Sequence, residues 1–108
     1  MDNETVWYKI VDIKNDKVLT LFHGVNGSKT LPKNQWVKAE KKIVSDGKST
    51  KYLSGFHVVP SHEESVEYLK MFKNVKYKKI IPVFVRGEVR KKEHSPSNIW
   101  LADEIFII

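Results

Sequence analysis

Residues 55–72 read GFHVVPSHEESVEYLKMF, and they hold the strongest indication of fold class in the chain. Their first five residues, 55–59, are rich in apolar and β-branched side chains, which is typical of a strand, and this run ends at Pro60. Ser61 and Glu64 then have the spacing of a capping box, in which the serine caps the third helical amide and the glutamate reaches back. A strand that leads directly into a capped helix indicates a mixed architecture.

The predicted helix is amphipathic. Apolar side chains recur at a spacing of three residues, at Val66, Leu69 and Phe72, and such a stripe is typical of a helix that packs one face on a sheet. Glutamates early in the helix and lysines late in it also suit the helix dipole. The charged residues expected on or near the solvent side are Glu63, Glu67, Lys70 and Lys73.

Most of the remaining chain is predicted to form strands, because short apolar and β-branched runs alternate with turn formers. Lys14-Asn15-Asp16-Lys17 is expected to close a hairpin between the first two runs. Pro32 is expected to open the next element, around Trp36, where a short helix and a strand fit equally well. The predicted strands cover residues 5–13, 18–22, 42–44, 50–53, 55–59, 80–85 and 99–108.

Two features of the C-terminal third qualify this pattern. Pro82 lies within the apolar run 80–85, and because proline has no amide hydrogen it predicts a strand end or an edge there. Residues 86–98 are polar, and the part from 86 to 97 is expected to be a basic surface segment rather than a strand.

These elements predict an α+β fold: a curved, mainly antiparallel sheet of five to seven strands with one amphipathic helix packed on one face. The chain has 108 residues, 41% of them hydrophobic and 30% charged, which suits a single domain over residues 1–108. The tryptophans at 7, 36 and 100 have apolar neighbours and are expected in the core.

The composition excludes several classes of protein. There is no cysteine, so neither a disulfide framework nor a thiolate metal site can form, and no histidine pair has the helical spacing of a metal site. No metal site is therefore predicted. The first residues are acidic and no apolar run approaches the length of a membrane span, so we expect a cytoplasmic protein with no membrane partner.

Positive charge is concentrated in two blocks of the sequence. The formal net charge is +6, and residues 29–51 carry seven basic side chains against two acidic ones, while residues 70–92 carry nine against one. If folding joins the two blocks, they form a surface for a polyanion whose binding would weaken with salt. The alternative is that these lysines only keep the outer faces of strands and loops in water.

Aromatic and basic side chains also alternate around Tyr77. Lysine neutralises phosphate, and a tyrosine ring can stack on a base, so this pattern favours nucleic acid as a partner. The candidate nucleic-acid-binding residues are Lys29, Lys33, Lys76, Tyr77, Lys78, Lys79, Arg90, Lys91 and Lys92.

His23 and His57 each follow a phenylalanine where a strand meets a loop. Because neighbouring side chains of a strand point to opposite faces, both rings could line one face while the phenylalanines enter the core. Each ring is then either a hydrogen-bonded structural histidine or part of a concave ligand site. The candidate ligand-binding residues are His23, Asn26, Gly27, Ser28 and His57, with Tyr52 beside them.

The order of these motifs resembles the ADP-ribosyltransferase-like folds: a strand ending in His-Gly, then Gly-Phe-His-Val before a capped helix, then a last strand with a glutamate. The resemblance implies an enzyme that uses NAD. It implies that His23 holds the NAD ribose, that Tyr52 or His57 stacks on the nicotinamide, and that Glu104 steers the transfer.

The compact, lysine-rich, cysteine-free chain also resembles the small proteins of phages and prophages, which implies a binder of a host or defence component. Three functions therefore stay open. The first is a non-enzymatic binding protein for a nucleotide or nucleic acid, without a cofactor. The second is the NAD-using enzyme, and the third is an inhibitor of a host protein, for which charge only steers the encounter. The sequence leaves the oligomeric state open.

Overall fold

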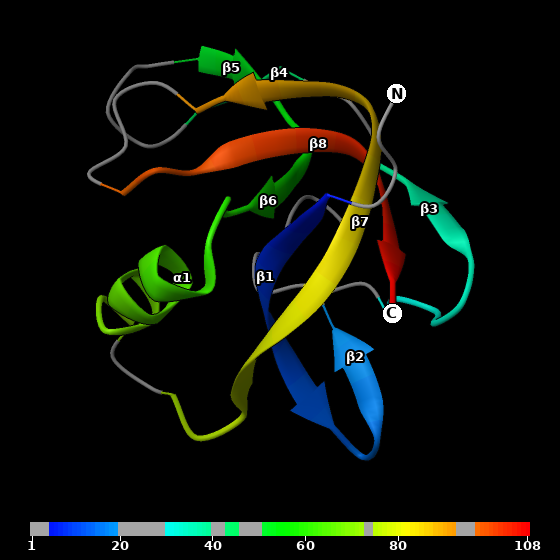
Figure 1. Ribbon diagram of the computed structural model, residues 1–108, viewed down its shortest axis with the longest axis vertical. Helices are drawn as coiled ribbons and strands as arrows, with labels where there is room; N and C mark the ends of the chain where they lie inside the picture. The colour runs from blue at the N-terminus through cyan, green and yellow to red at the C-terminus, as the bar shows by residue number, and fades with distance from the viewer. Residues whose placement is uncertain (1–4, 20–29, 40–42, 46–50, 73–74, 93–96) are drawn as a thin grey trace.

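The structure is a computed structural model, and it describes residues 5–19, 30–39, 43–45, 51–72, 75–92 and 97–108. One helix and eight strands lie in this part of the chain (Figure 1). They are β1 (Val6–Lys14), β2 (Lys17–Leu19), β3 (Trp36–Lys38), β4 (Ile43–Ser45), β5 (Lys51–Leu53), β6 (Phe56–Val58), α1 (His62–Leu69), β7 (Lys78–Lys91) and β8 (Trp100–Ile107).

Six of these strands form one curled sheet that resembles half of a barrel (Figure 1). Its order is β2-β1-β7-β8-β3, and β6 pairs with β8 off this path. Strands β4 and β5 form a separate two-stranded sheet. Every strand pair among the described residues is antiparallel. The predicted α+β fold with a curved antiparallel sheet is confirmed.

The N-terminal hairpin has the turn that the sequence predicts. Asn15 and Asp16 both have positive φ, 52° and 62°, between the paired residues Lys14 and Lys17. Two central residues in the left-handed region are characteristic of a type I′ turn, and Asn and Asp tolerate this conformation better than other non-glycine residues. The undecided segment around Trp36 is also settled, since β3 pairs with β8 as a strand.

The helix begins at its predicted cap. The Glu64 amide donates to Ser61 Oγ over 3.1 Å, while the Ser61 hydroxyl donates to Glu64 Oε2 over 2.9 Å. The glutamate therefore reaches the serine hydroxyl, and its other oxygen accepts from Asn98 Nδ2 over 3.1 Å. The helix ends at Leu69, so Phe72, the last residue of the predicted stripe, follows the helix.

Helix α1 covers part of the sheet face opposite the main core. The rings of Tyr8 and His62 meet edge to face with their centroids 5.5 Å apart, and Tyr8 alternates with residues of β1 that point into the core. The predicted packing of the helix on one sheet face is thus confirmed. Ser65 is fully buried, and its hydroxyl donates to the His62 carbonyl over 2.6 Å.

Strand β7 runs through Pro82, where the proline predicted a strand end or an edge. Pro82 lies opposite Tyr8, whose own backbone N–H and C=O bond to Val59 on the other side. The proline nitrogen therefore faces away from β1. On that side the pairing of β7 with β8 starts one residue later, at Val83 opposite Ile107, so no ladder bond needs the missing amide hydrogen. The predicted strand end is therefore wrong, but the predicted edge agrees with the register, since no described strand lies beside Pro82 on the side away from β1.

The prediction of a basic surface segment from residue 86 onward is wrong for residues 86–91, which continue β7. Two of their side chains, Arg86 and Arg90, pair with carboxylates of β8. Arg86 lies opposite Glu104, and the register shifts between Arg86 and Val89, where Gly87 has a φ of 81°. A bulge of this kind lets one strand carry an extra residue and bend.

The main core fills the inside of the curled sheet. Val11, Val58, Val83 and Ile105 are completely buried there, and Trp7 and Trp100 pack against them with ring centroids 5.9 Å apart. Trp36 differs from this prediction: it lies under the Arg86 guanidinium, 4.2 Å from the ring centroid, and packs edge to face on Phe106. No helix among the described residues is long and apolar enough to cross a membrane.

Replacing Gly87 by alanine is expected to lower the free energy of unfolding by about 1–3 kcal/mol. The positive φ disfavours any side chain, and an added Cβ would lie 3.0 Å from Cβ of Asp103. Chemical denaturation of G87A and of Lys91→Ala, a change at an exposed residue of the same strand, measures the difference. Equal stability of the two variants would show that a side chain at position 87 causes no strain in the bulge.

Candidate anion-binding site

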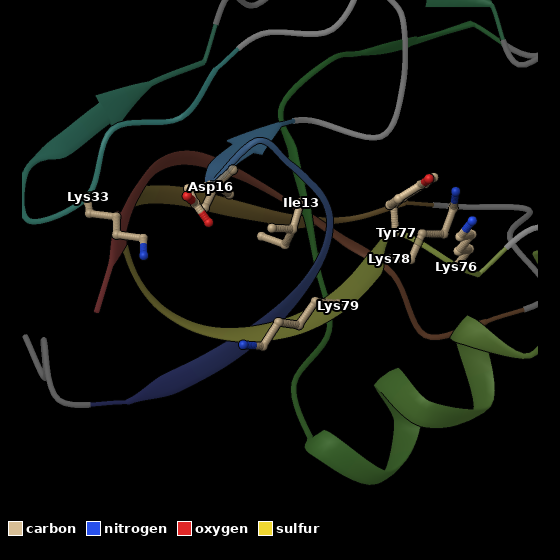
Figure 2. A pocket seen from close by; sticks show the side chains of 8 residues that line it. Ile13, Asp16, Lys33, Lys76, Tyr77, Lys78 and Lys79 are labelled. Atoms are coloured by element: carbon tan, nitrogen blue, oxygen red, sulfur yellow. The ribbon is translucent and has the colours of Figure 1, made fainter.

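A hollow of about 500 Å³ lies where β1, β2 and the start of β7 meet (Figure 2). We refer to it as the lysine hollow, because four of its eight lining residues are lysines. In Figure 2, Lys33 lies on one side, Tyr77 with Lys76 and Lys78 on the other, and Ile13 between them. The lining residues are Ile13, Asp16, Val18, Lys33, Lys76, Tyr77, Lys78 and Lys79.

Strand register places an apolar row at the base of this hollow. Ile13 pairs with Val18 across the hairpin, and its amide donates to the Tyr77 carbonyl over 2.7 Å on the other side. Residues opposite one another in antiparallel strands point to the same face, so the three side chains share the inner face of the sheet. Val18 belongs to the core and Ile13 packs against it, so the lysine hollow is the open mouth of the core.

The two basic blocks of the sequence meet here. Lys33 comes from the first block, and Lys76 and Lys79 come from the second. All three are exposed. Lys79 pairs with Val11, a core residue, and therefore starts from the inner face as well. The structure thus brings Lys33 of the first block to the same hollow as lysines of the second block.

Lys78 has a different environment from the other three lysines. Its Nζ lies 3.4 Å from Asp12 Oδ1, with the side chains only 18% and 15% exposed, and 5.6 Å from the centroid of the Phe72 ring. Asp12 neutralises much of its charge. Lys78 therefore fastens β7 to β1 and to the chain after the helix more than it supplies positive potential to the hollow.

Tyr77 stands between cations at one side of the hollow. Its ring centroid is 5.2 Å from Lys76 Nζ and 5.8 Å from Lys14 Nζ, and the residue is 48% exposed. Such distances are those of cation–π contacts. Sequence reasoning missed Lys14 as a site residue. Its position beside Tyr77 depends on the register of β1 with β7, which no local pattern specifies.

Asp16 is the single carboxylate among the described residues that line the hollow. It was predicted only as a turn residue, and Ile13 and Val18 only as strand residues. No local pattern signals that a turn carboxylate and two core side chains share a site with lysines more than fifty residues away. Asp16 subtracts from the positive potential, so three exposed lysines face one carboxylate.

Arg90, Lys91 and Lys92, the other basic residues predicted to bind nucleic acid, do not line the hollow. They lie at the opposite end of the long strand β7 or just past it (Figure 1). Arg90 pairs with Glu88 over 2.7 Å and with Asp103 over 3.4 Å, so its charge is already compensated. The second basic block is thus divided between two ends of the molecule.

His57 does not line the hollow either. It lies in β6, paired with Leu101, and points away from the core side that Phe56 and Val58 occupy. Burial, followed by the charges of Lys9 and Lys92, lowers the pKa of His57 to about 3. The ring is therefore neutral at physiological pH and supplies no positive charge to an anion.

Lys9 is the most unusual charged group of the described chain. It is only 4% exposed, it lies on the inner face of β1 opposite Ile81, and burial lowers its pKa to about 8. Its Nζ donates to the His57 carbonyl over 3.1 Å and lies 5.6 Å from the centroid of the Phe56 ring. A carbonyl and a ring face replace part of the water that the ammonium group lost.

Glu104, the glutamate predicted for NAD chemistry, lies in β8 and is held by Arg86. The guanidinium Nη2 is 2.7 Å from Oε1, and Nε is 3.4 Å from Oε2. The Arg86 hydrogen bond keeps the pKa of Glu104 below its usual value, and the same bond raises the pKa of Arg86.

The other predicted site residues fall outside what the structure describes. His23, Asn26, Gly27, Ser28 and Lys29 are not among the described residues, and only the backbone of Tyr52, in β5 opposite Val44, is described. The shared site of His23 and His57 and the NAD-binding arrangement therefore stay predictions. Comparisons of this chain with protein-family models, with curated proteins and with solved structures find no match.

Replacing Lys9 by methionine is expected to raise the free energy of unfolding at pH 7 by about 1–3 kcal/mol, because the folded state then no longer buries an ammonium group. The pKa of Lys9 is about 8 in the folded chain and 10.5 ordinarily, so between these pH values the unfolded chain binds more protons than the folded chain. The free-energy cost of burying the ammonium group therefore disappears as the pH rises from 8 to 10.5. Urea denaturation of both proteins at pH 7 and pH 10 measures this. An equal difference at both pH values would contradict it.

Acid is expected to destabilise the protein through His57. The pKa of His57 is about 3 in the folded chain and 6.5 ordinarily, so between these pH values the unfolded chain binds more protons than the folded chain. The free energy of unfolding is therefore highest above pH 6.5 and decreases as the pH falls toward 3. Between pH 7 and pH 5 the loss is about 1–2 kcal/mol. Between the same two pH values, the free energy of unfolding of His57→Gln should decrease by about 1–2 kcal/mol less than that of the natural chain. The matched change His62→Gln, at an exposed histidine, should keep the sensitivity of the natural chain, and identical behaviour of both variants would refute the assignment.

Proposed function

We propose that this protein is a non-enzymatic binding protein for nucleic acid and that it holds the phosphate backbone at the lysine hollow. One observation supports this proposal above all others. Three exposed lysines from two distant parts of the chain, Lys33, Lys76 and Lys79, surround one concave site.

The alternative interpretation of the lysines, that they only keep surfaces in water, predicts no convergence. Lysines that only solvate a surface gain nothing from approaching one another, because like charges repel. Among the described residues one carboxylate lines the same hollow, and the aspartate that compensates Lys78 lies outside it. A phosphate group would relieve the repulsion, and it would release counterions on binding.

The location also suits a binding site. Ligand sites of β-barrels are common at their mouths, where the strands leave the packed interior and apolar side chains lie next to polar ones. Lys9 and His57 do not contribute, since one is enclosed in the core and the other is neutral.

Replacing Lys79 by alanine is expected to weaken binding of an oligonucleotide, measured by fluorescence anisotropy, several-fold at low salt. The slope of log affinity against log salt should fall by about 0.7–0.9 for each phosphate that the variant no longer neutralises. Lys91→Ala is the matched control: both residues are exposed lysines of β7, but they lie at opposite ends of the strand. Far-UV circular dichroism confirms folding of both.

Two results would contradict the proposal. The first is an affinity that does not depend on salt, since phosphate binding by lysines must release ions. The second is an equal loss in Lys79→Ala and Lys91→Ala, which would place the binding outside the hollow. Asp16→Asn gives a test of opposite sign, because it removes the negative charge without disturbing a turn that asparagine also tolerates, and it should strengthen binding.

A further inference from the structure

The lysine hollow has an apolar base that phosphate binding alone does not explain. Ile13 and the ring of Tyr77 supply the accessible part of this base, while Val18 is only 5% exposed and belongs to the core below it. Phosphate groups gain nothing from such a surface. A ligand that offers an apolar group together with its negative charge uses more of the hollow than phosphate alone does.

We infer that the occupant is a single-stranded segment of nucleic acid with one base stacked on Tyr77, an inference that rests on the proposed function. A nucleobase is flat and weakly polar on its faces, and phosphates accompany it on either side along the strand. The hollow of about 500 Å³ falls within the volume range of ligand pockets and is large enough for a nucleoside unit.

The backbone of Tyr77 places the residue beside the hollow. Its carbonyl accepts the Ile13 amide at 2.7 Å, which fixes the residue at the end of the β1–β7 ladder, while nearly half of the residue remains exposed. Nζ of Lys14 and Nζ of Lys76 lie over the Tyr77 ring, 5.8 and 5.2 Å from its centroid, so a base that stacks on the ring takes the place of one ammonium group, which then meets a phosphate next to that base. Stacking on aromatic rings with flanking cations is a common way to bind single strands.

A duplex cannot use this site in the same way. Its bases are paired and stacked on one another, so only phosphates and groove edges reach a protein surface, and the apolar row stays uncovered. Inorganic polyphosphate has the charge but no base. A free mononucleotide has a base but offers phosphates on one side only, whereas lysines lie on both sides of Ile13 (Figure 2). The structure therefore favours a single strand over all three.

The test compares four probes on one protein: a single-stranded oligonucleotide of about ten residues, its duplex, inorganic polyphosphate of similar charge, and a mononucleotide. The single strand should bind several-fold more tightly than the duplex, and the mononucleotide should not compete at equal concentration. Tyr77→Ala should weaken single-strand binding roughly 5- to 150-fold, with an unchanged salt slope and unchanged polyphosphate binding. Tyr77→Phe keeps the ring and should bind as the natural chain does.

The outcomes separate this inference from the proposed function. If Lys79→Ala weakens binding while Tyr77→Ala does not, or if the duplex binds as tightly as the single strand, the hollow binds phosphate alone and the stacking inference is wrong. If a mononucleotide competes as well as the strand, the ligand is a nucleotide and the inference of a strand is wrong. If none of the nucleic-acid probes binds, both proposals fail. A thermal melt shows that each variant folds.

Discussion

Strand β7 pairs with β1 along its first half and with β8 along its second, and this double pairing holds the rest of the structure in place. The ladder with β1 spans residues 78–84 and the ladder with β8 spans residues 83–91, so the two overlap only at Val83 and Phe84. A strand that changes partners along its length must bend and twist, and the Gly87 bulge provides part of that bend. The sheet therefore curls around its core instead of lying flat.

The lysine hollow is a consequence of this offset. Because β8 ends opposite Val83, it does not extend beside the first residues of β7, and the sheet consists there of β2, β1 and β7. The inner face of that part has no strand of β8 to close it. Core side chains such as Ile13 and Val18 are consequently found in the same hollow as lysines, a combination that suits a ligand with both charge and a flat apolar group.

In the second half of β7, basic residues lie beside carboxylates of β8. Arg86 and Arg90 lie beside Glu104 and Asp103 of β8, and their charges are used for pairing within the sheet. No such ion pair joins Lys79, at the start of β7, to another described residue, whereas Lys78 pairs with Asp12. Basic residues of one sequence block thus have two different roles, and the presence or absence of β8 beside them decides which.

Local features of the chain were sufficient for much of the fold. The capping box, the Asn15-Asp16 turn and the apolar runs act over a few residues, so the helix start, the hairpin and most strands follow from the sequence, as does the excess of positive charge. The tertiary structure decided the rest: the strand character of residues 86–91, the placement of His57 outside the lysine hollow, and the placement of Lys33 and Lys79 around it. These depend on pairing between residues as far apart as Asp12 and Lys78, 66 positions along the chain, and no short-range pattern specifies which distant strands will pair.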